Sequence, residues 1–294
     1  MRIDVLKTYK LYIDGKFPRT ESGRTLEVAT AGGDVHLCKA SRKDLREAVE
    51  AARKAQAGWA SATAYLRGQI LYRIAEMVEG KRRELAEAIG AVAGKKPGGK
   101  KAGPRGLKPD DEVGLAVDRL VHYAGWADKY AQVLGCNNPV SGPFYNFTVP
   151  EPVGVVAVVC PDEAPLLAMA TMLGSVVAPG NAAVVVASEK NPIPAAVFAE
   201  ACATGDVPGG VVNILTGERA ELLPHVSSHR DIDAVVAANL TAEQAALLRA
   251  GAAENLKRVT VHAVKDWASA AECEHPWWIE RVVEMKTMWH SAGA

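Results

Sequence analysis

Two adjacent carboxylates, Asp162 and Glu163, stand in the stretch VVCPDEAPLL, after a β-branched run and before an apolar one. Carboxylate pairs act as general acid and base when their surroundings separate their pKa values. No nucleophile or metal ligand accompanies this pair in the sequence. We therefore predict that the two acids lie at a helix N-terminus, where each stabilises the helix dipole by roughly 0.3–1 kcal/mol.

Five cysteines are the other residues with reactive chemistry, and their odd number without a CxxC spacing favours neither a disulfide framework nor a zinc site. Cys160 ends an apolar run, which predicts a buried and inert thiol. Cys273 is expected to be exposed, but no histidine arrangement can be assigned to it. His225 and His229 have the spacing of a helical metal pair, yet the two serines and Asp231 around them indicate that the helix ends there. No metal site is predicted.

The elements that position these residues alternate along the second half of the chain. The β-branched runs are VGVVAVV, AAVVVA, VVNIL, IDAVVA and RVTVHAV, and helical segments separate them. Such alternation predicts right-handed βαβ units and a five-stranded parallel sheet with helices on both faces. The fold class is therefore α/β and Rossmann-like, although no GxGxxG motif occurs.

The first half of the chain carries a different pattern. Residues 11–28 predict a hairpin with its turn at Asp14-Gly15. Ser41 and Asp44 have the spacing of a capping box, and further helices are expected around residues 66–78 and from about 113 to 134. Residues 92–112, rich in Gly, Pro and Lys, form either an anion-binding loop or a solvated flexible loop. We favour the flexible loop, because no strand leads into it and its spacing is not that of a P-loop.

Overall charge excludes some classes of function. Lys and Arg number 34 and so do Asp and Glu, so the formal net charge is zero. A neutral chain has no general attraction to nucleic acid or to an anionic membrane. The first residues show no apolar segment typical of a signal peptide, and unpaired cysteines fit a reducing compartment. We therefore expect a cytoplasmic protein without a membrane span.

Several motifs in unbroken order resemble those of aldehyde dehydrogenases. EPVGVVAVVCPDEAPLL is similar to the strand and turn that commonly reads PWNFP in that family. APGNAAVVVASEKNP, VPGGVVNILTGE and SSHRDIDAVVAANL are similar to later segments, and the resemblance runs from LYIDGK to KRVTV. It implies an NAD-binding domain of the aldehyde dehydrogenase type, with a non-standard Rossmann sheet.

The resemblance also places substitutions at the family's functional positions. The Asn that helps to hold the oxyanion falls on Glu163, and the general-base Glu falls on His262. The Lys that binds the adenosine ribose falls on Val186, whereas the Glu that shares the ribose is kept as Glu189. Leu240 replaces the small glycine turn at the pyrophosphate. The resemblance thus implies no catalytic residue and no cofactor of the chain's own, with Glu189 as a vestigial cofactor-binding candidate and NAD bound by a partner.

Beyond RVTV the family has its catalytic domain with the nucleophilic Cys, and here a short segment leads instead to EMKTMWHS, which resembles the family's closing strand. We expect an NAD-binding-like domain over 1–138 and 151–265, a linker or helix over 266–281, and the strands of an oligomerisation arm over 139–150 and 282–291. The arm residues expected at an interface are Phe144, Tyr145, Asn146, Phe147, Thr148, Val149, Met285, Lys286, Thr287, Met288 and Trp289. Trp277, Trp278 and Trp289 fit either an interface or the core.

One subfamily is similar in this combination, the family-16 aldehyde dehydrogenases, in which an active unit precedes a shortened unit without a catalytic Cys. The resemblance implies a catalytically inactive subunit that forms a hetero-oligomer with a full-length, active aldehyde dehydrogenase. Two alternatives stay open. A residual NAD(P)-binding module is supported by Glu189 and opposed by Val186 and Leu240, and an independent oxidoreductase acting on aldehydes would need a nucleophile that the sequence does not supply.

Overall fold

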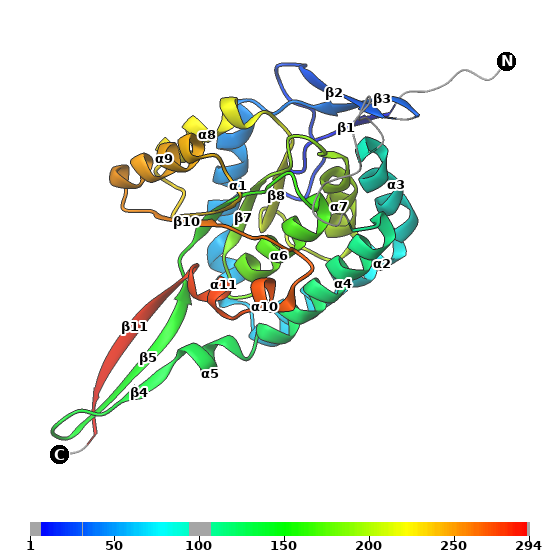
Figure 1. The fold of residues 1–294 in the computed structure, drawn as a ribbon. Coiled ribbons are helices and arrows are strands. Elements are labelled where there is room, and N and C mark those ends of the chain that lie inside the picture. Colours follow the sequence, from blue (N-terminus) through cyan, green and yellow to red (C-terminus); the bar gives the residue numbers. More distant parts are fainter. Residues whose placement is uncertain (1–6, 31, 94–106, 293–294) are drawn as a thin grey trace.

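The computed structural model describes residues 7–30, 32–93 and 107–292, and a five-stranded parallel sheet lies at its centre (Figure 1). Its strands are β6 (Val155–Val159), β7 (Ala182–Val186), β8 (Val212–Leu215), β9 (Ala234–Ala238) and β10 (Arg258–His262). Their order in the sheet is β10-β9-β6-β7-β8, with every pairing parallel. This confirms the predicted fold class. The order reverses at β6, since the chain continues to β7 and β8 on one side and then returns to β9 on the other.

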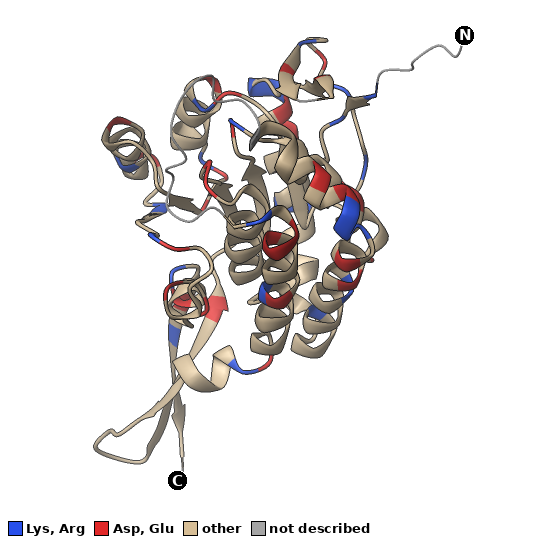
Figure 2. Ribbon diagram, turned by 45° about the vertical axis from the view of Figure 1, so that its right-hand side comes forward, with Lys and Arg blue, Asp and Glu red and all other residues tan. Residues whose placement is uncertain are grey.

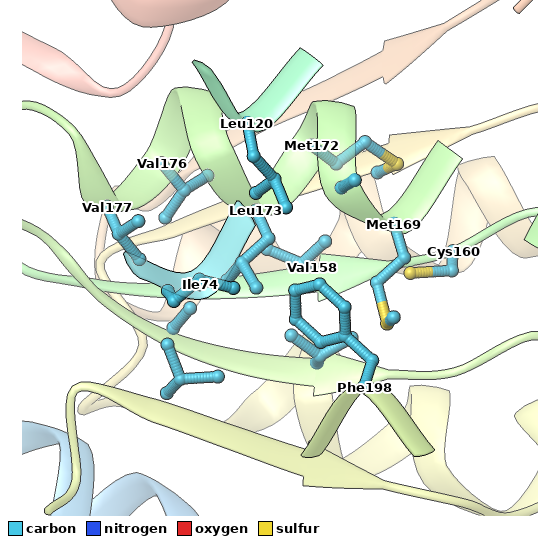
Figure 3. Packing of buried hydrophobic residues seen from close by; sticks show 14 of the residues in the cluster. Ile74, Leu120, Val158, Cys160, Met169, Met172, Leu173, Val176, Val177 and Phe198 are labelled. Atoms are coloured by element: carbon cyan, nitrogen blue, oxygen red, sulfur yellow. The ribbon is translucent and has the colours of Figure 1, made fainter. Parts of the chain in front are cut away.

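One face of the sheet packs against a layer of helices that includes the apolar helix after β6. The helices of this layer are α2 (Ala64–Gly80), α3 (Arg82–Ala93), α4 (Pro109–Trp126), α6 (Pro165–Val177) and α7 (Ile193–Thr204). Val156 and Val158 of β6 point toward them, and both are fully buried. Figure 3 shows Leu173 of α6 and Phe198 of α7 around Val158. Alternate residues of a strand face opposite sides, so the other face has its own core.

The opposite face carries the second layer of helices. These helices are α1 (Arg42–Ser61), α8 (Arg219–Ser228) and α9 (Ala242–Gly251), with a short 3₁₀ helix at Ala252–Glu254. The residues of β6 on this side are Val155, Ala157 and Val159. Helices α1 and α9 begin with capping boxes, in which Ser41 pairs with Asp44 and Thr241 with Gln244. Both reciprocal pairs satisfy N–H groups that a helix start leaves free.

The helical predictions fail in two places. A single helix from about 113 to 134 is wrong, because α4 ends at Trp126 and a separate α5 (Tyr130–Leu134) follows. Helix α3 was not predicted, and the two ends of the segment 92–112 belong to α3 and α4. Within that segment, residues 94–106 lie outside the described residues. None of the described helices is long and apolar enough to cross a lipid bilayer.

A small sheet lies near the N-terminal part of the described chain. Its strands are β1 (Thr8–Tyr9), β2 (Thr25–Thr30) and β3 (Gly33–Cys38), in the order β1-β3-β2. The predicted turn is present, since Asp14 and Gly15 have φ values of 53° and 71° and the Ile13 N–H donates to the Lys16 carbonyl at 3.0 Å. The hairpin ends near residue 18, however, because β2 pairs with β3 and not with residues 11–13.

A third sheet projects from the body of the molecule as an arm (Figure 1). Its antiparallel strands are β4 (Cys136–Asn138), β5 (Phe144–Pro152) and β11 (Val283–Ser291), in the order β11-β5-β4. All nine residues of β11 pair with β5, from Val283 opposite Pro152 to Ser291 opposite Phe144. Residues 136–150 contain no charged side chain, and Figure 2 shows the outer part of the arm without charge.

Candidate functional site

The loops that follow β6, β7, β9 and β10 meet at the carboxyl edge of the sheet, where the strand order reverses between β6 and β9. Open α/β sheets bind ligands in the crevice at such a point. A cavity of about 710 Å³ lies there, and residues 162–165, 190–191, 239 and 264–267 contribute to its walls. This carboxyl-edge cavity is therefore the candidate functional site.

Asp162 has an ionic partner that sequence patterns did not reveal. The two Nη atoms of Arg219 donate to its carboxylate oxygens at 2.8 and 2.9 Å. Its Oδ1 also accepts hydrogen bonds from Ser188 Oγ at 2.9 Å and from the N–H groups of Glu189 and Lys190 at 3.0 and 3.1 Å. Burial raises the pKa of Asp162, but the hydrogen bonds and charge of Arg219 outweigh it and leave the pKa below its usual value. Asp162 lies just before Ala164, the N-cap of α6, as predicted, but its hydrogen bonds anchor the loop after β7 and do not cap that helix.

Glu112, on α4, is the carboxylate that contacts the N-terminus of α6. Its Oε1 accepts the N–H groups of Leu166 and Leu167 at 2.9 and 3.3 Å, and its side chain is almost fully buried. Burial raises the pKa of Glu112, and the two N–H bonds only partly oppose this shift. Sequence analysis missed this residue because it lies more than fifty positions before the helix that it contacts.

Glu189, the predicted vestigial cofactor ligand, contacts the start of α8. Its Oε2 accepts the backbone N–H of Arg219 at 3.0 Å, and so it satisfies a free donor of the first helical turn. Val186, at the family's lysine position, is fully buried at the end of β7. The carboxylate of Glu189 is therefore engaged within the chain, and its role in cofactor binding stays a prediction.

Asn239 joins three of the edge loops. It has a left-handed backbone with φ of 52°, which short amide side chains tolerate. Its Nδ2 donates to the Val264 carbonyl and its Oδ1 accepts the Val264 N–H, both at 3.0 Å. The same Nδ2 lies 3.4 Å from Glu163 Oε2. The neighbouring Leu240 packs against the core on the side of the sheet that α1, α8 and α9 cover. The hydrogen bonds between Asn239 and Val264 thus fix the loop after β9, at the position where the family has its glycine turn.

The thiols of this chain are mostly inaccessible. Four cysteines are buried, namely Cys38, Cys160, Cys202 and Cys273. Burial raises the pKa of Cys160 to about 12 and also raises the pKa of Cys273. The prediction that Cys273 is exposed is wrong, since it is fully buried on the short helix α10 (Ala270–Cys273). Only Cys136, on the arm, is exposed. Because the thiolate is the nucleophile, no cysteine at the carboxyl edge has the character of a reactive one.

His262, at the family's general-base position, is the last residue of β10. Its imidazole stacks on the indole of Trp278, with ring centroids 3.7 Å apart. Burial, with a smaller effect from the charge of Arg281, lowers the pKa of His262 to about 4. Its Nε2 is buried without a hydrogen-bond partner in the described part of the chain. The imidazole is therefore neutral near pH 7, and its contact with the Trp278 indole is a packing contact.

The connection from β10 to β11, residues 263–282, folds over α4 and α6. Arg119 of α4, only 1% exposed, donates to Thr171 Oγ1 at 3.1 Å and to the Trp267 carbonyl at 3.3 Å. Its Nε lies 3.2 Å from Glu274 Oε1, and the Tyr123 hydroxyl donates to the Cys273 carbonyl at 2.9 Å. The expected linker 266–281 is thus a packed segment with two short helices, α10 and α11 (Trp277–Glu280).

The predicted interface residues of the arm differ in exposure. Five large apolar ones are between 36% and 63% exposed, namely Phe144, Tyr145, Met285, Met288 and Trp289. Phe147, Thr148 and Val149 are half-buried, and Lys286 and Thr287 are exposed. Lys286 forms an ion pair with Glu151, and Thr287 shares a hydrogen bond with Thr148 at 2.8 Å. Asn146 is buried, and its Oδ1 accepts from Asn138 of the unpredicted strand β4 at 2.6 Å.

The remaining histidine and tryptophan candidates divide between core and surface. His225 lies in the last turn of α8, and His229 follows it with Nδ1 accepting the Asp231 N–H at 3.2 Å. Trp278 is buried, whereas Trp277 is 49% exposed. The described residues contain no group of three His, Cys, Asp or Glu side chains suited to a metal ion.

Comparisons with known proteins agree with this arrangement. The sequence model of the aldehyde dehydrogenase family matches residues 22–263. The chain is similar to the mitochondrial aldehyde dehydrogenase of Sus scrofa, with 33% identity over 258 residues that cover 86% of this chain and 47% of that protein. It is also similar to an aldehyde dehydrogenase of Aspergillus niger, with 32% identity over 256 residues that cover 85% of this chain and 49% of the relative.

Solved structures give the same result. The NAD⁺ complex of aldehyde dehydrogenase from Bacillus cereus superposes with a TM-score of 0.78 and 29% sequence identity, over 87% of this chain and 51% of that chain. The chain therefore spans about half the length of the relatives that it matches. On the extent of the family match and the identity to these relatives, the chain belongs to the aldehyde dehydrogenase family.

Proposed function

We propose that this chain is a catalytically inactive aldehyde-dehydrogenase-like subunit that assembles with a full-length, active aldehyde dehydrogenase. Membership of the family and coverage of about half of its relatives' length support this proposal. The sequence resemblance to the shortened second unit of family-16 enzymes is the reason for proposing an inactive unit that accompanies an active one. Five unpaired cysteines favour a reducing, cytoplasmic setting for the complex.

The proposed inactivity is supported by the chemistry of the carboxyl edge. Cys160 directly follows β6, and Cys273 lies in the segment after β10. Both are fully buried, and burial raises the pKa of each thiol. Glu163 stands where an amide would donate to a developing oxyanion, and an ionised carboxylate cannot donate. His262 is packed against an indole, and its Nε2 makes no hydrogen bond to any described residue. Among the described residues, this edge therefore offers no cysteine and base placed to form and resolve a covalent intermediate.

Cofactor binding by this chain is the alternative that we do not favour. A ribose at Glu189 would compete with the Arg219 N–H for the same carboxylate, and Val186 offers no hydrogen bond. In the proposed complex NAD is bound by the active partner. Titration calorimetry of the isolated chain with NAD and NADP tests this, and micromolar binding of either would revive the alternative.

The observation that carries the proposed assembly is the apolar, uncharged outer arm. Strand β11 lies at the edge of the described sheet, and eight of its nine residues are exposed. Its two charged residues, Glu284 and Lys286, form ion pairs with Arg258 and Glu151, and residues 287–291 contain no Asp, Glu, Lys or Arg. A long edge strand without proline is a template for pairing with another chain. Met285, Met288 and Trp289 add exposed apolar surface to that edge. Strand addition by a partner would satisfy the free backbone groups and cover these side chains together.

Co-expression with a full-length aldehyde dehydrogenase, followed by size-exclusion chromatography with light scattering, tests the assembly. We expect one complex from the pair, and we expect Trp289→Ser, on the arm, to weaken it. Leu256→Ser is the matched control, since Leu256 is 90% exposed but lies outside the arm. Separate elution of the two unsubstituted proteins, or equal effects of both substitutions, would refute the proposed role of the arm.

An aldehyde-dependent assay of NADH formation tests the proposed inactivity. The isolated chain should produce no NADH above background with short or long aldehydes. When the complex forms, the active partner should differ from the partner alone in its rate of NADH formation, in its thermal stability, or in both. Turnover by the isolated chain would show that it is an independent oxidoreductase.

A further inference from the structure

The carboxyl-edge cavity has a chemical character that the proposed assembly does not use. Its volume of about 710 Å³ lies in the range of small-molecule sites in proteins. Apolar side chains make up much of its wall, among them Ile89, Leu107, Pro165 and Val264. The few polar groups that share this wall therefore decide which ligand fits.

Glu112 is the first of these polar groups. It lines the cavity and is 3% exposed, so its carboxylate lies at the inner end of the site. Its Oε1 accepts the two N–H groups at the start of α6, whereas its Oε2 has no hydrogen-bond partner within the described ranges. A carboxylate on a side chain that is buried to this extent is costly unless a donor or a positive charge reaches its second oxygen. This position therefore favours a ligand that donates hydrogen bonds.

Asn191 is an independent second observation. Its Nδ2 donates to the carbonyls of Ala88 and Ile89 at 3.1 and 3.2 Å, which fixes the orientation of the amide. Its Oδ1 is left buried without a partner in the part of the chain that the structure describes, and Asn191 also lines the cavity at 7% exposure. Two acceptors beside the same cavity, one on Glu112 and one on Asn191, thus lack donors among the described residues.

The charges around the cavity also favour a positively charged ligand. Four acidic residues line it, namely Glu112, Asp162, Glu163 and Asp266, against Lys190 and Lys265. Arg219 neutralises Asp162, and Lys190 and Lys265 balance Glu163 and Asp266 in number, so Glu112 is the acidic group without a counterion among the described lining residues. Trp267 also lines the cavity, and an indole attracts a cation that reaches its face.

We infer that the carboxyl-edge cavity binds a small, mainly apolar molecule that carries a protonated amine. The ammonium group donates to the free oxygens of Glu112 and Asn191, and the apolar body of the ligand packs against the wall. An ammonium has three N–H donors, so a single nitrogen can serve more than one acceptor. This site is separate from the arm and does not depend on the proposed assembly.

Titration calorimetry with 2-phenylethylamine tests the inference on the full chain. The matched probes are 2-phenylethanol, which lacks the charge, and 3-phenylpropanoate, which reverses it. We expect the amine alone to bind at millimolar or lower concentration. Equal binding of the alcohol, preferred binding of the acid, or no binding of the amine would each overturn the inference.

Substitution of Glu112 tests the position of the ammonium. Glu112→Gln keeps an oxygen that can accept the two N–H bonds of α6 but removes the charge, and amine affinity should fall about tenfold or more. Asp111→Asn is the matched control, because Asp111 precedes Glu112 on α4 and is exposed. A thermal melt of each variant checks that it is folded. An unchanged amine affinity in folded Glu112→Gln, or an equal loss in Asp111→Asn, would exclude the assigned site.

Discussion

The packing of His262 against Trp278 predicts how the stability of this protein depends on pH. The imidazole has a folded-state pKa of about 4, below the value of 6.5 expected when it is solvated. As the pH falls, the unfolded chain therefore takes up a proton before the folded one does. The contribution of His262 to stability is complete above pH 6.5 and is lost progressively as the pH falls toward 4.

The size of this contribution follows from the shift. One pKa unit corresponds to about 1.4 kcal/mol, so the difference between the two states amounts to about 3 kcal/mol in full. At about pH 5 the unfolded imidazole is almost fully protonated and the folded one is not, which gives a loss of about 2 kcal/mol relative to pH 8. His262→Phe removes the titrating group and keeps an aromatic ring against Trp278. Since Nε2 has no partner among the described residues, the phenyl ring leaves no hydrogen bond unmade.

Urea denaturation followed by circular dichroism, at pH values from about 8 to 5, measures the effect. Wild type and His262→Phe should have similar free energies of unfolding at pH 8, and the variant should be the more stable one by about 2 kcal/mol at pH 5. His290→Asn, at an exposed position of β11, should follow the wild type throughout. Parallel loss of stability in wild type and His262→Phe would refute the assignment of a protected, neutral imidazole.

Three further outcomes are expected. Arg119→Met should reduce the free energy of unfolding by about 1–3 kcal/mol, measured by urea denaturation, because it removes the buried donor to the Thr171 hydroxyl and the Trp267 carbonyl. A thiol reagent should modify one cysteine, Cys136, in the native protein and all five after unfolding. Thr241→Ala should cost about 1 kcal/mol in thermal or urea unfolding, because it removes the side-chain acceptor for the Gln244 N–H at the start of α9.

The central sheet was predictable because its strands are buried on both faces. Every residue of β6, β7, β8 and β9 is buried, and such strands appear in sequence as continuous β-branched runs. The alternation of these runs with helices then determines the parallel class of the sheet. The two capping boxes were predictable for a similar reason, since their reciprocal bonds span only three residues.

The contacts of the carboxyl edge were not predictable, because they join distant positions. Arg219 lies 57 residues from Asp162, and Glu112 lies 54 residues from the Leu166 N–H that it accepts. Nothing in either local sequence indicates such a partner. Cys273 looked exposed for the same reason, since the tryptophans that surround its segment gain their burial from α4 and α6.

The continuous register between β5 and β11 bears on the kinetics of any association through the arm. All nine residues of β11 already pair within the chain, so a partner meets a formed strand and not a segment that must fold on contact. Little backbone entropy is then lost during docking, and the encounter rate should change little between arm variants. Differences in affinity among such variants should appear mainly as changes in the lifetime of the complex.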